Sequence, residues 1–375
     1  MDTTPVAFDE RPAGGGARVG FARLDAPRTL NALSPEMIDA LLERLEAWTG
    51  DPGVACIVLD GAGDRGFCAG GDVVRLRDAM ARAGDRAEVA RFYAHEYRLD
   101  RLIHASPKPV VCWGHGIVMG GGMGLMAGAS HRIVTEASRL AMPEVSIGFY
   151  PDVGATWFLN RMPAPVGHFL GLTAAQAGAD DALLLGLADY RVDSQRQEAL
   201  YQALLDTPWT GHADEDRALA SRTVRRFAQD VDPDRSGSPV LRNWSRIAAA
   251  MDHRGVAEIL AHLETLADAD AWLGRAAATL RAGSPTAACV ILEQLRRGRH
   301  LSLAAAFERE LRMSLHFAAG RDFPEGVRAL LVDKDRAPRW QPSSLADVTP
   351  EMVERYFDED EAALPADALL PPARA

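Results

Sequence analysis

The stretch KPVVCWGHGIVMGGGMG, residues 108–124, decides the fold of this chain. Its apolar run PVVCW (109–113) is bounded by proline and glycine, which is typical of a short strand buried on both faces of a sheet. A dense glycine run follows, and its continuation MGLMAGA (123–129) has the composition of a helix. The run VACIVLD (54–60) repeats the strand pattern. We therefore expect an α/β fold with parallel strand pairing.

Two segments are dense in glycine and follow the expected strands, GAGDRGFCAGGD (61–72) and HGIVMGGGMG (115–124). Neither has the Gly-Lys-Ser/Thr ending of a phosphate-binding P-loop. Because glycine has no Cβ, such loops let backbone N–H groups come close to a ligand. Two N–H groups from separate loops can stabilise the charge that develops on a carbonyl oxygen, as an oxyanion hole does. The alternative is that both segments are only tight turns.

Carboxylates occupy unusual positions in two apolar stretches. Glu144 and Asp152 each follow a proline in MPEVSIGFYPDVG (142–154). A helix over about 87–105 would place Glu96 on the same face as Phe92, Leu99 and Ile103. An acid on an apolar face needs a partner or a role. The alternatives are a cap at Glu144, an Asx-turn at Asp152, and a snorkelling or ion-paired Glu96.

The chain divides by composition into a core and a helical region. Residues 16–200 alternate expected strands and helices, and one helix follows Ser34, which is a good N-cap. Residues 201–360 are rich in Ala, Leu, Arg and Glu with helical periodicity. We expect the ends, 1–15 and 361–375, to be loosely ordered.

The net charge of −11 argues against a nucleic-acid partner, and no apolar run approaches the length of a membrane span. The N-terminus contains acids and lacks the basic and apolar regions of a signal peptide. The four cysteines form neither a CxxC pair nor a Cys/His cluster, so we expect no metal and no disulfide framework. Small core thiols in a reducing cytoplasm are the simplest interpretation.

Three motifs in order, FCAGGD (67–72), residues 108–124 and MPEVSIGFYPDVGATWFLNR (142–161), resemble the enoyl-CoA hydratase/isomerase (crotonase) superfamily. HEYRLDRLIHASPKP (95–109) and GRDFPEGVRALLVDKDRAPRWQP (320–342) resemble its 3-hydroxyisobutyryl-CoA hydrolase branch. The resemblance implies a spiral of ββα repeats followed by a helical C-terminal region. It also implies an acyl-CoA substrate, with coenzyme A as part of the substrate and no other cofactor, and a homo-oligomer, either a trimer or a hexamer.

The resemblance also implies site residues. The thioester oxygen would accept hydrogen bonds from the N–H groups of Ala69 and Gly121, and Glu144 and Asp152 would act on the thioester. The remaining candidates are the substrate-binding residues Glu96, Gly70 and Gly120, and Arg23 and Arg28 for the phosphates of coenzyme A. A solvated surface position is the alternative for both arginines.

One departure from the superfamily distinguishes the reactions. Hydratases of the superfamily carry a glutamate three residues after the middle glycine of the GGG loop, where this chain has Gly124. They usually carry glycine where this chain has Asp152. The exchange favours hydrolysis of a 3-hydroxyacyl-CoA, such as 3-hydroxyisobutyryl-CoA of valine catabolism, to the free acid. The alternatives are an enoyl-CoA hydratase or isomerase, and a catalytically silent acyl-CoA-binding protein.

Overall fold

The structure is a computed structural model that describes residues 5–82, 86–163, 165–229 and 237–358. Its larger sheet has six strands in the order β1 (Val6–Pro12), β2 (Arg18–Leu24), β3 (Val54–Gly61), β5 (Val110–Gly114), β7 (His131–Val134) and β9 (Tyr190–Arg191). Only β1 runs antiparallel to its neighbour. The parallel pairing expected for residues 54–60 and 109–113 is confirmed, since Ile57 pairs with Val110.

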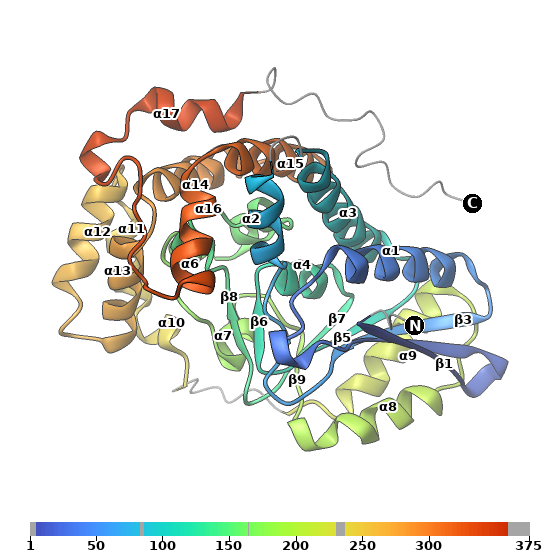
Figure 1. Ribbon diagram of the computed structural model, residues 1–375. Coiled ribbons are helices and arrows are strands. Elements are labelled where there is room, and N and C mark those ends of the chain that lie inside the picture. Colours follow the sequence, from blue (N-terminus) through green and yellow to red (C-terminus); the bar gives the residue numbers. More distant parts are fainter. Residues whose placement is uncertain (1–4, 83–85, 164, 230–236, 359–375) are drawn as a thin grey trace.

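A smaller sheet consists of three parallel strands, β4 (Gly66–Cys68), β6 (Ile117–Met119) and β8 (Arg139–Ala141). Each repeat places one strand in the larger sheet, the next strand in the smaller sheet, and then a helix. The helices of the first two repeats are α2 (Val73–Ala81), α3 (Arg86–Ala105) and α4 (Gly121–Gly128). The predicted α/β spiral of ββα units is therefore confirmed, and Figure 1 shows its helices beside the strands.

Local signals account for the first long helix. Helix α1 (Pro35–Gly50) begins after Ser34, whose side chain accepts a hydrogen bond from the N–H of Met37. Proline suits the first helical position because its missing N–H would have no intrahelical partner. Its buried face, which includes Ile38 and Leu45, recurs at helical spacing and packs against α3.

The expectation of a loosely ordered lead-in over residues 1–15 is wrong for β1. Residues 6–12 pair with β2 from Val6 opposite Leu24 to Pro12 opposite Arg18. Proline at the end of an edge strand leaves no ladder hydrogen bond unmade. Residues 1–4 and 361–375 lie outside the described residues.

Two apolar clusters lie on opposite faces of the larger sheet. Alternate residues of β3 point to each face, Cys56 and Val58 to one cluster and Ile57 and Leu59 to the other. The smaller cluster is covered by α8 (Gln197–Leu205) and α9 (Ala213–Arg225). The larger cluster runs without a break from the sheet into the C-terminal helices. The division into regions 16–200 and 201–360 therefore stays a prediction.

The remaining elements are mostly helical, and Figure 1 shows that the helices from α10 onward pack on the side of the molecule away from β1. They are η1 (Gly14–Gly16), η2 (Pro27–Thr29), η3 (Glu144–Ile147), α5 (Ala155–Phe158), η4 (Leu159–Arg161), α6 (Val166–Thr173), α7 (Ala179–Leu184), η5 (Ser194–Arg196), α10 (Pro239–Arg242), α11 (Trp244–Met251), α12 (Val256–Thr265), α13 (Ala271–Ala282), α14 (Pro285–Gly298), α15 (Leu303–Ala319), α16 (Asp322–Val327), η6 (Arg328–Val332), η7 (Leu345–Asp347), α17 (Pro350–Glu354) and η8 (Arg355–Phe357).

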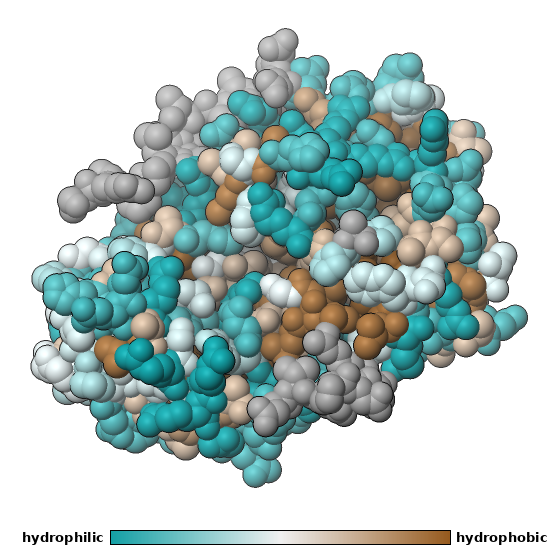
Figure 2. Space-filling model, turned by 180° about the vertical axis from the view of Figure 1, so that it is seen from behind, coloured by the Kyte–Doolittle hydropathy of each residue, from teal (hydrophilic) through white to brown (hydrophobic). Residues whose placement is uncertain are grey.

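Among the described residues, none of the helices is both long and apolar enough to cross a membrane. The face seen in Figure 2 is mainly hydrophilic, with one hydrophobic area near its centre.

Candidate active site

The two glycine loops meet in space. They follow β4 and β6, which are parallel neighbours in the smaller sheet, so the loops leave the same edge. A Cβ on Gly70 would lie 3.4 Å from the carbonyl oxygen of Met119 and 3.7 Å from the nitrogen of Gly121. Gly70 has φ 114° and Gly120 has φ 49°, conformations that favour glycine. The glycines therefore allow a close approach of two backbones.

One predicted N–H donor is already used within the protein. The N–H of Ala69 donates to the carbonyl oxygen of Leu30 at 3.0 Å. A ligand oxygen would have to replace this bond, so the assignment of Ala69 to the oxyanion hole is not supported. The sequence motif placed the donor two residues too early.

Gly71 is the better donor from this loop. It forms a parallel bridge with Leu33, in which Leu33 donates to the carbonyl of Gly70 and Asp72 donates to the carbonyl of Leu33. In such a bridge the N–H of Gly71 points away from Leu33 and is not used for the pairing. Its nitrogen lies 3.4 Å from the position of a Cβ on Gly121. Gly121 begins α4, where an N–H has no intrahelical acceptor. The N–H groups of Gly71 and Gly121 are therefore the pair that can bind one oxygen.

Glu144 lies against this pair of loops. It begins η3 directly after Pro143 and is buried. Its Oε1 atom lies 3.1 Å from the position of a Cβ on Gly120. Its Oε2 atom has no hydrogen-bond partner among the described residues. Burial is the main reason that the pKa of Glu144 is raised well above its usual value, and the neighbouring carboxylates of Asp152 and Glu96 add to the shift.

Asp152 is buried and is held by an aromatic hydroxyl. The hydroxyl of Tyr97 donates to its Oδ2 atom at 2.7 Å. Burial raises the pKa of Asp152 to about 7, and the hydrogen bond from Tyr97 opposes this shift. Asp152 is therefore poised to change charge near neutral pH.

Glu96 faces the glycine pair. Its Oε1 atom lies where a methyl group on Gly121 would be, and 3.8 Å from a Cβ position on Gly71. Its side chain is buried, and no cation pairs with it in the described part of the chain. The snorkelling and ion-paired alternatives are therefore wrong. Burial, and then the charge of Asp152, raise the pKa of Glu96 well above its usual value.

The structure leaves no room for a side chain at position 124. A Cβ on Gly124 would lie 2.6 Å from Cβ of Val153 and 2.7 Å from Oδ2 of Asp100. Val153 has φ 53°, which is strained for a β-branched residue. The position at which hydratases of the superfamily carry an acid is thus closed by the side chains of Val153, which follows Asp152, and of Asp100.

Residues from the C-terminal helices hold this strained backbone. Glu310 of α15 accepts hydrogen bonds from the N–H of Gly154 at 2.7 Å and of Thr156 at 2.8 Å. Gln294 of α14 donates to the carbonyl of Pro151 at 2.6 Å. The sequence analysis missed these residues. Each is a single polar residue in an amphipathic helix, and nothing in the local sequence sets it apart.

A second set of hydroxyl groups lies behind Asp152. The hydroxyl of Ser314 in α15 lies 2.6 Å from that of Tyr97 and 2.8 Å from that of Tyr150. Tyr150 in turn donates to the carbonyl of Glu310 at 2.5 Å. The orientation of Asp152 therefore depends on α3 and α15 together.

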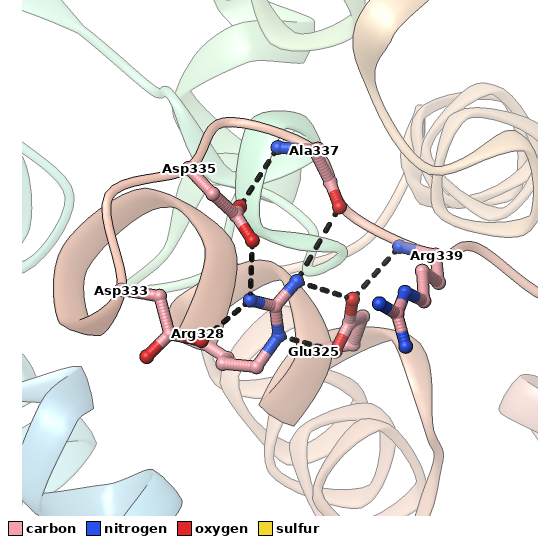
Figure 3. Close-up of polar contacts among 6 residues, drawn as sticks. All are labelled: Glu325, Arg328, Asp333, Asp335, Ala337 and Arg339. Atoms are coloured by element: carbon pink, nitrogen blue, oxygen red, sulfur yellow. Dashed lines mark hydrogen bonds and ion pairs between the residues drawn. The ribbon is translucent and has the colours of Figure 1, made fainter.

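The block 320–342 is tied together by one arginine. Arg328 donates to Glu325, Asp333 and Asp335 at 2.6–2.9 Å, and Figure 3 shows its guanidinium group enclosed by these carboxylates. The N–H of Arg339 donates to the same Glu325 at 2.8 Å. The contacts close the loop after η6 into a compact turn.

This turn is placed against the stretch between the two acids. A Cβ on Gly148 would lie 2.6 Å from the carbonyl oxygen of Asp322 and 2.9 Å from the ring of Trp340. Trp340 is anchored by its indole N–H, which donates to the carbonyl of Ala282 at 2.9 Å. The C-terminal block thus forms one wall behind the segment from Glu144 to Asp152.

The two arginines predicted for the coenzyme A phosphates differ in availability. Arg23 makes two hydrogen bonds to the buried Asp60, at 2.9 and 2.6 Å. Arg28 is exposed in η2, in the loop that leads to Leu33 beside Gly121.

Within the described parts of the chain, no group of three or more His, Cys, Asp or Glu side chains could hold a metal ion.

Fold and site together define a class of protein. The model of the enoyl-CoA hydratase/isomerase family matches residues 19–357, so the chain belongs to this family. Within it, the chain is 36% identical to a mitochondrial 3-hydroxyisobutyryl-CoA hydrolase of Gallus gallus, over 92% of this chain and 86% of the relative. It is 37% identical to 3-hydroxyisobutyryl-CoA hydrolase 1 of Arabidopsis thaliana, over 94% of this chain and 93% of the relative.

Solved structures of the same fold carry other activity names. A carnitinyl-CoA dehydratase from Mycobacterium thermoresistibile superposes with a TM-score of 0.85 at 35% identity, covering 99% of this chain and 100% of that one. An enoyl-CoA hydratase from Rhodobacter sphaeroides superposes with a TM-score of 0.81 at 35% identity, covering 94% of this chain and 97% of that one. The similarity therefore extends over the C-terminal helices as well as the spiral.

Proposed function

We propose that this protein is an enzyme that hydrolyses a 3-hydroxyacyl-CoA thioester, with 3-hydroxyisobutyryl-CoA as substrate and 3-hydroxyisobutyrate and coenzyme A as products. One observation carries the proposal. Glu144 lies against the glycine loops that offer two backbone N–H groups and interacts electrostatically with Asp152, while Gly124 has no space for the second acid of a hydratase. The names of the curated relatives support the same substrate.

In this proposal the thioester oxygen accepts hydrogen bonds from the N–H groups of Gly71 and Gly121. Gly70 and Gly120 allow the two loops to approach the substrate. The N-terminus of α4 adds positive potential at the same point. Losing one oxyanion donor typically lowers the rate by about 10²–10³-fold.

Glu144 is the group that acts on the carbonyl carbon. It either attacks to form a mixed anhydride, which water then hydrolyses, or it removes a proton from the attacking water. Label that enters the Glu144 carboxylate during a single turnover in ¹⁸O-labelled water would show the anhydride route. The label enters the Glu144 carboxylate only if an anhydride forms.

Asp152 and Glu96 are proposed to bind the acyl part of the substrate and to handle its protons. Raised pKa values keep a proton available at such buried acids near neutral pH. Arg28 is the better candidate for the coenzyme A phosphates, because Arg23 is already bound to Asp60.

The test is release of free thiol from 3-hydroxyisobutyryl-CoA, 3-hydroxypropionyl-CoA and enoyl-CoA thioesters. We expect release from the two hydroxyacyl thioesters and none above background from the Glu144→Gln variant. If the wild-type protein releases coenzyme A from none of them, the hydrolase proposal fails. Unchanged turnover of Glu144→Gln would remove that residue from its role.

Hydration of an enoyl-CoA is the second candidate, because the two solved structures at 35% identity carry dehydratase and hydratase names. It predicts loss of enoyl-thioester absorbance without thiol release. An isomerase would convert its substrate with neither signal. A silent acyl-CoA-binding protein would bind the thioesters and turn over none.

We further propose a cytoplasmic location and a homo-oligomer, a trimer or a hexamer. The four cysteines are free, which fits a reducing compartment. Three of the most similar relatives from animals are named mitochondrial, so fractionation of the source cells is the test of location. Light scattering behind size-exclusion chromatography gives the mass, and a monomer would contradict the oligomer.

A further inference from the structure

Two helices border the site, and acidic side chains of one face glycines of the other. On α3, Glu96 and Asp100 are four residues apart and lie on one face. On α4, Gly121 and Gly124 are three residues apart and also share a face. Glu96 lies over Gly121, and Asp100 lies over Gly124. The missing side chains on α4 thus make room for two carboxyl groups, one helical turn apart.

Asp100 differs from Asp152 and Glu310 because neither of its carboxyl oxygens has a partner. It is fully buried, and neither carboxyl oxygen has a hydrogen-bond partner among the described residues. By contrast, Asp152 accepts from Tyr97, and Glu310 accepts from two N–H groups. A buried polar group without a partner typically costs about 1–3 kcal/mol. Such a group in a native protein calls for an explanation, and a bound polar group is one that the position of Asp100 allows.

The position of Asp100 suits the acyl part of the proposed substrate. Three residues of α-helix advance about 4.5 Å, so Gly124 lies about that far along α4 from the oxyanion donor Gly121. The hydroxyl-bearing carbon of a 3-hydroxyacyl group is two bonds from the carbonyl carbon. With the carbonyl oxygen on Gly121, a hydroxyl on that carbon can reach the level of Gly124, where the carboxyl of Asp100 lies.

The chemical form of Asp100 also matches a hydroxyl. Burial is the main reason that its pKa is raised well above its usual value, and Glu96, Asp152 and Glu310 raise it further. A protonated carboxyl both donates and accepts a hydrogen bond, as a hydroxyl group does. An apolar substituent at the same place would leave both oxygens without a partner.

We propose that Asp100 is a specificity-determining residue that binds the hydroxyl of the acyl group and so selects hydroxyacyl over unsubstituted acyl thioesters. The inference rests on the proposed function and assigns a further residue to that site. Asp100 contributes no step to bond cleavage.

The experiment compares kcat/KM for 3-hydroxyisobutyryl-CoA with kcat/KM for isobutyryl-CoA. In the Asp100→Leu variant, we expect the ratio of the two values to fall about 10-fold or more, because one hydrogen bond is lost only with the hydroxylated substrate. Asp100→Asn retains a donor and an acceptor and should keep most of the preference. Asp268→Leu, at an exposed aspartate before α13, is the matched control and should leave the ratio unchanged.

Two results would overturn the inference. One is an equal loss for both substrates, which would show a structural role alone. The other is full activity of Asp100→Leu on both substrates. If Asp100→Leu does not fold, Asp100→Ala makes the same comparison with a smaller side chain. A wild-type protein that releases coenzyme A from neither substrate instead refutes the proposed function, so the two failures are distinguishable.

Discussion

At the scale of single residues, the site is a set of buried carboxyl groups that have no positively charged partner among the described residues. Burial raises the pKa of Glu96, Asp100, Glu144 and Asp152, and among the described residues none of the four forms a salt bridge. Burial disfavours the ionised form of each carboxyl, and each ionised neighbour raises the pKa of the next. The protonation of one acid therefore affects the pKa of its neighbours.

The raised pKa of Asp152 predicts how stability depends on pH. Its folded pKa is about 7, whereas an unfolded aspartate has a pKa of about 3.9. Between these values the folded state binds more protons than the unfolded state, so the free energy of unfolding falls as pH rises. We expect Asp152→Asn, which cannot ionise, to flatten this fall. Urea unfolding of both proteins from pH 4 to pH 8 is the measurement.

The prediction has a clear contrary outcome. If wild type and Asp152→Asn lose stability in parallel over this range, the pKa of Asp152 is not raised in the folded protein. Asp206→Asn is a control because this aspartate lies at the end of α8, away from the acids.

The lack of space at Gly124 predicts the effects of two substitutions at this position. A methyl group there meets Val153 and Asp100, so Gly124→Ala should destabilise the protein by about 1–3 kcal/mol. Gly124→Glu should not restore hydration of enoyl-CoA, since its side chain has no space. Thermal melting and an enoyl-CoA hydratase assay measure the two effects. Gly50→Ala, where a Cβ meets nothing, is the matched control.

At the scale of elements, α15 is a brace for the backbone that follows Asp152. Glu310 binds the N–H groups of Gly154 and Thr156, directly after the strained Val153. Strained backbone of this kind persists only where the surrounding structure holds it. The brace therefore keeps both Asp152 and the start of α5 in place.

Removing the brace should cost stability and activity together. Glu310→Ala leaves two buried N–H groups without acceptors, and we expect a loss of about 2–4 kcal/mol. kcat should fall more than KM changes, because Asp152 shifts while η2, which carries the proposed phosphate-binding Arg28, stays in place. Glu308→Ala, exposed on the same helix, is the control. Full activity in Glu310→Ala would show that α15 does not position Asp152.

Elements also show how far local sequence reaches. Helix α1 was predictable because Ser34 and the apolar spacing are local signals. The donor Gly71 was not predictable. Its N–H is left without an acceptor in the described part of the chain because Leu33 bonds to the residues on either side of it, Gly70 and Asp72. A motif locates the loop, but long-range pairing decides which N–H in it is available.

At the scale of the whole molecule, the C-terminal third forms the back wall of the site. Helices α14 and α15 and the turn that contains Trp340 all contact the segment from Glu144 to Asp152. The larger apolar cluster is continuous between the two regions. The segment cannot keep its shape without helices that follow it by more than a hundred residues.

Substitution of Arg328 tests whether the segment from Glu144 to Asp152 depends on the C-terminal turn. Arg328→Gln should loosen the turn around Trp340, lower the melting temperature and reduce kcat, because the wall behind Gly148 is no longer fixed. Differential scanning fluorimetry and the thiol-release assay are the measurements. Arg275→Gln, at an exposed position on α13, is the control. A variant with normal kcat would mean that the wall forms without Arg328.

The sequence by itself determined the repeating strands and helices, the two glycine loops and the pair of acids after prolines. Burial patterns, caps and the conformations of glycine and proline are properties of a few neighbouring residues. Only the tertiary structure decided that Gly71 rather than Ala69 offers its N–H, that Gly124 is closed, that Asp100 joins the acids, and that α14 and α15 brace them. These outcomes depend on contacts between residues far apart in the chain, which no local pattern encodes.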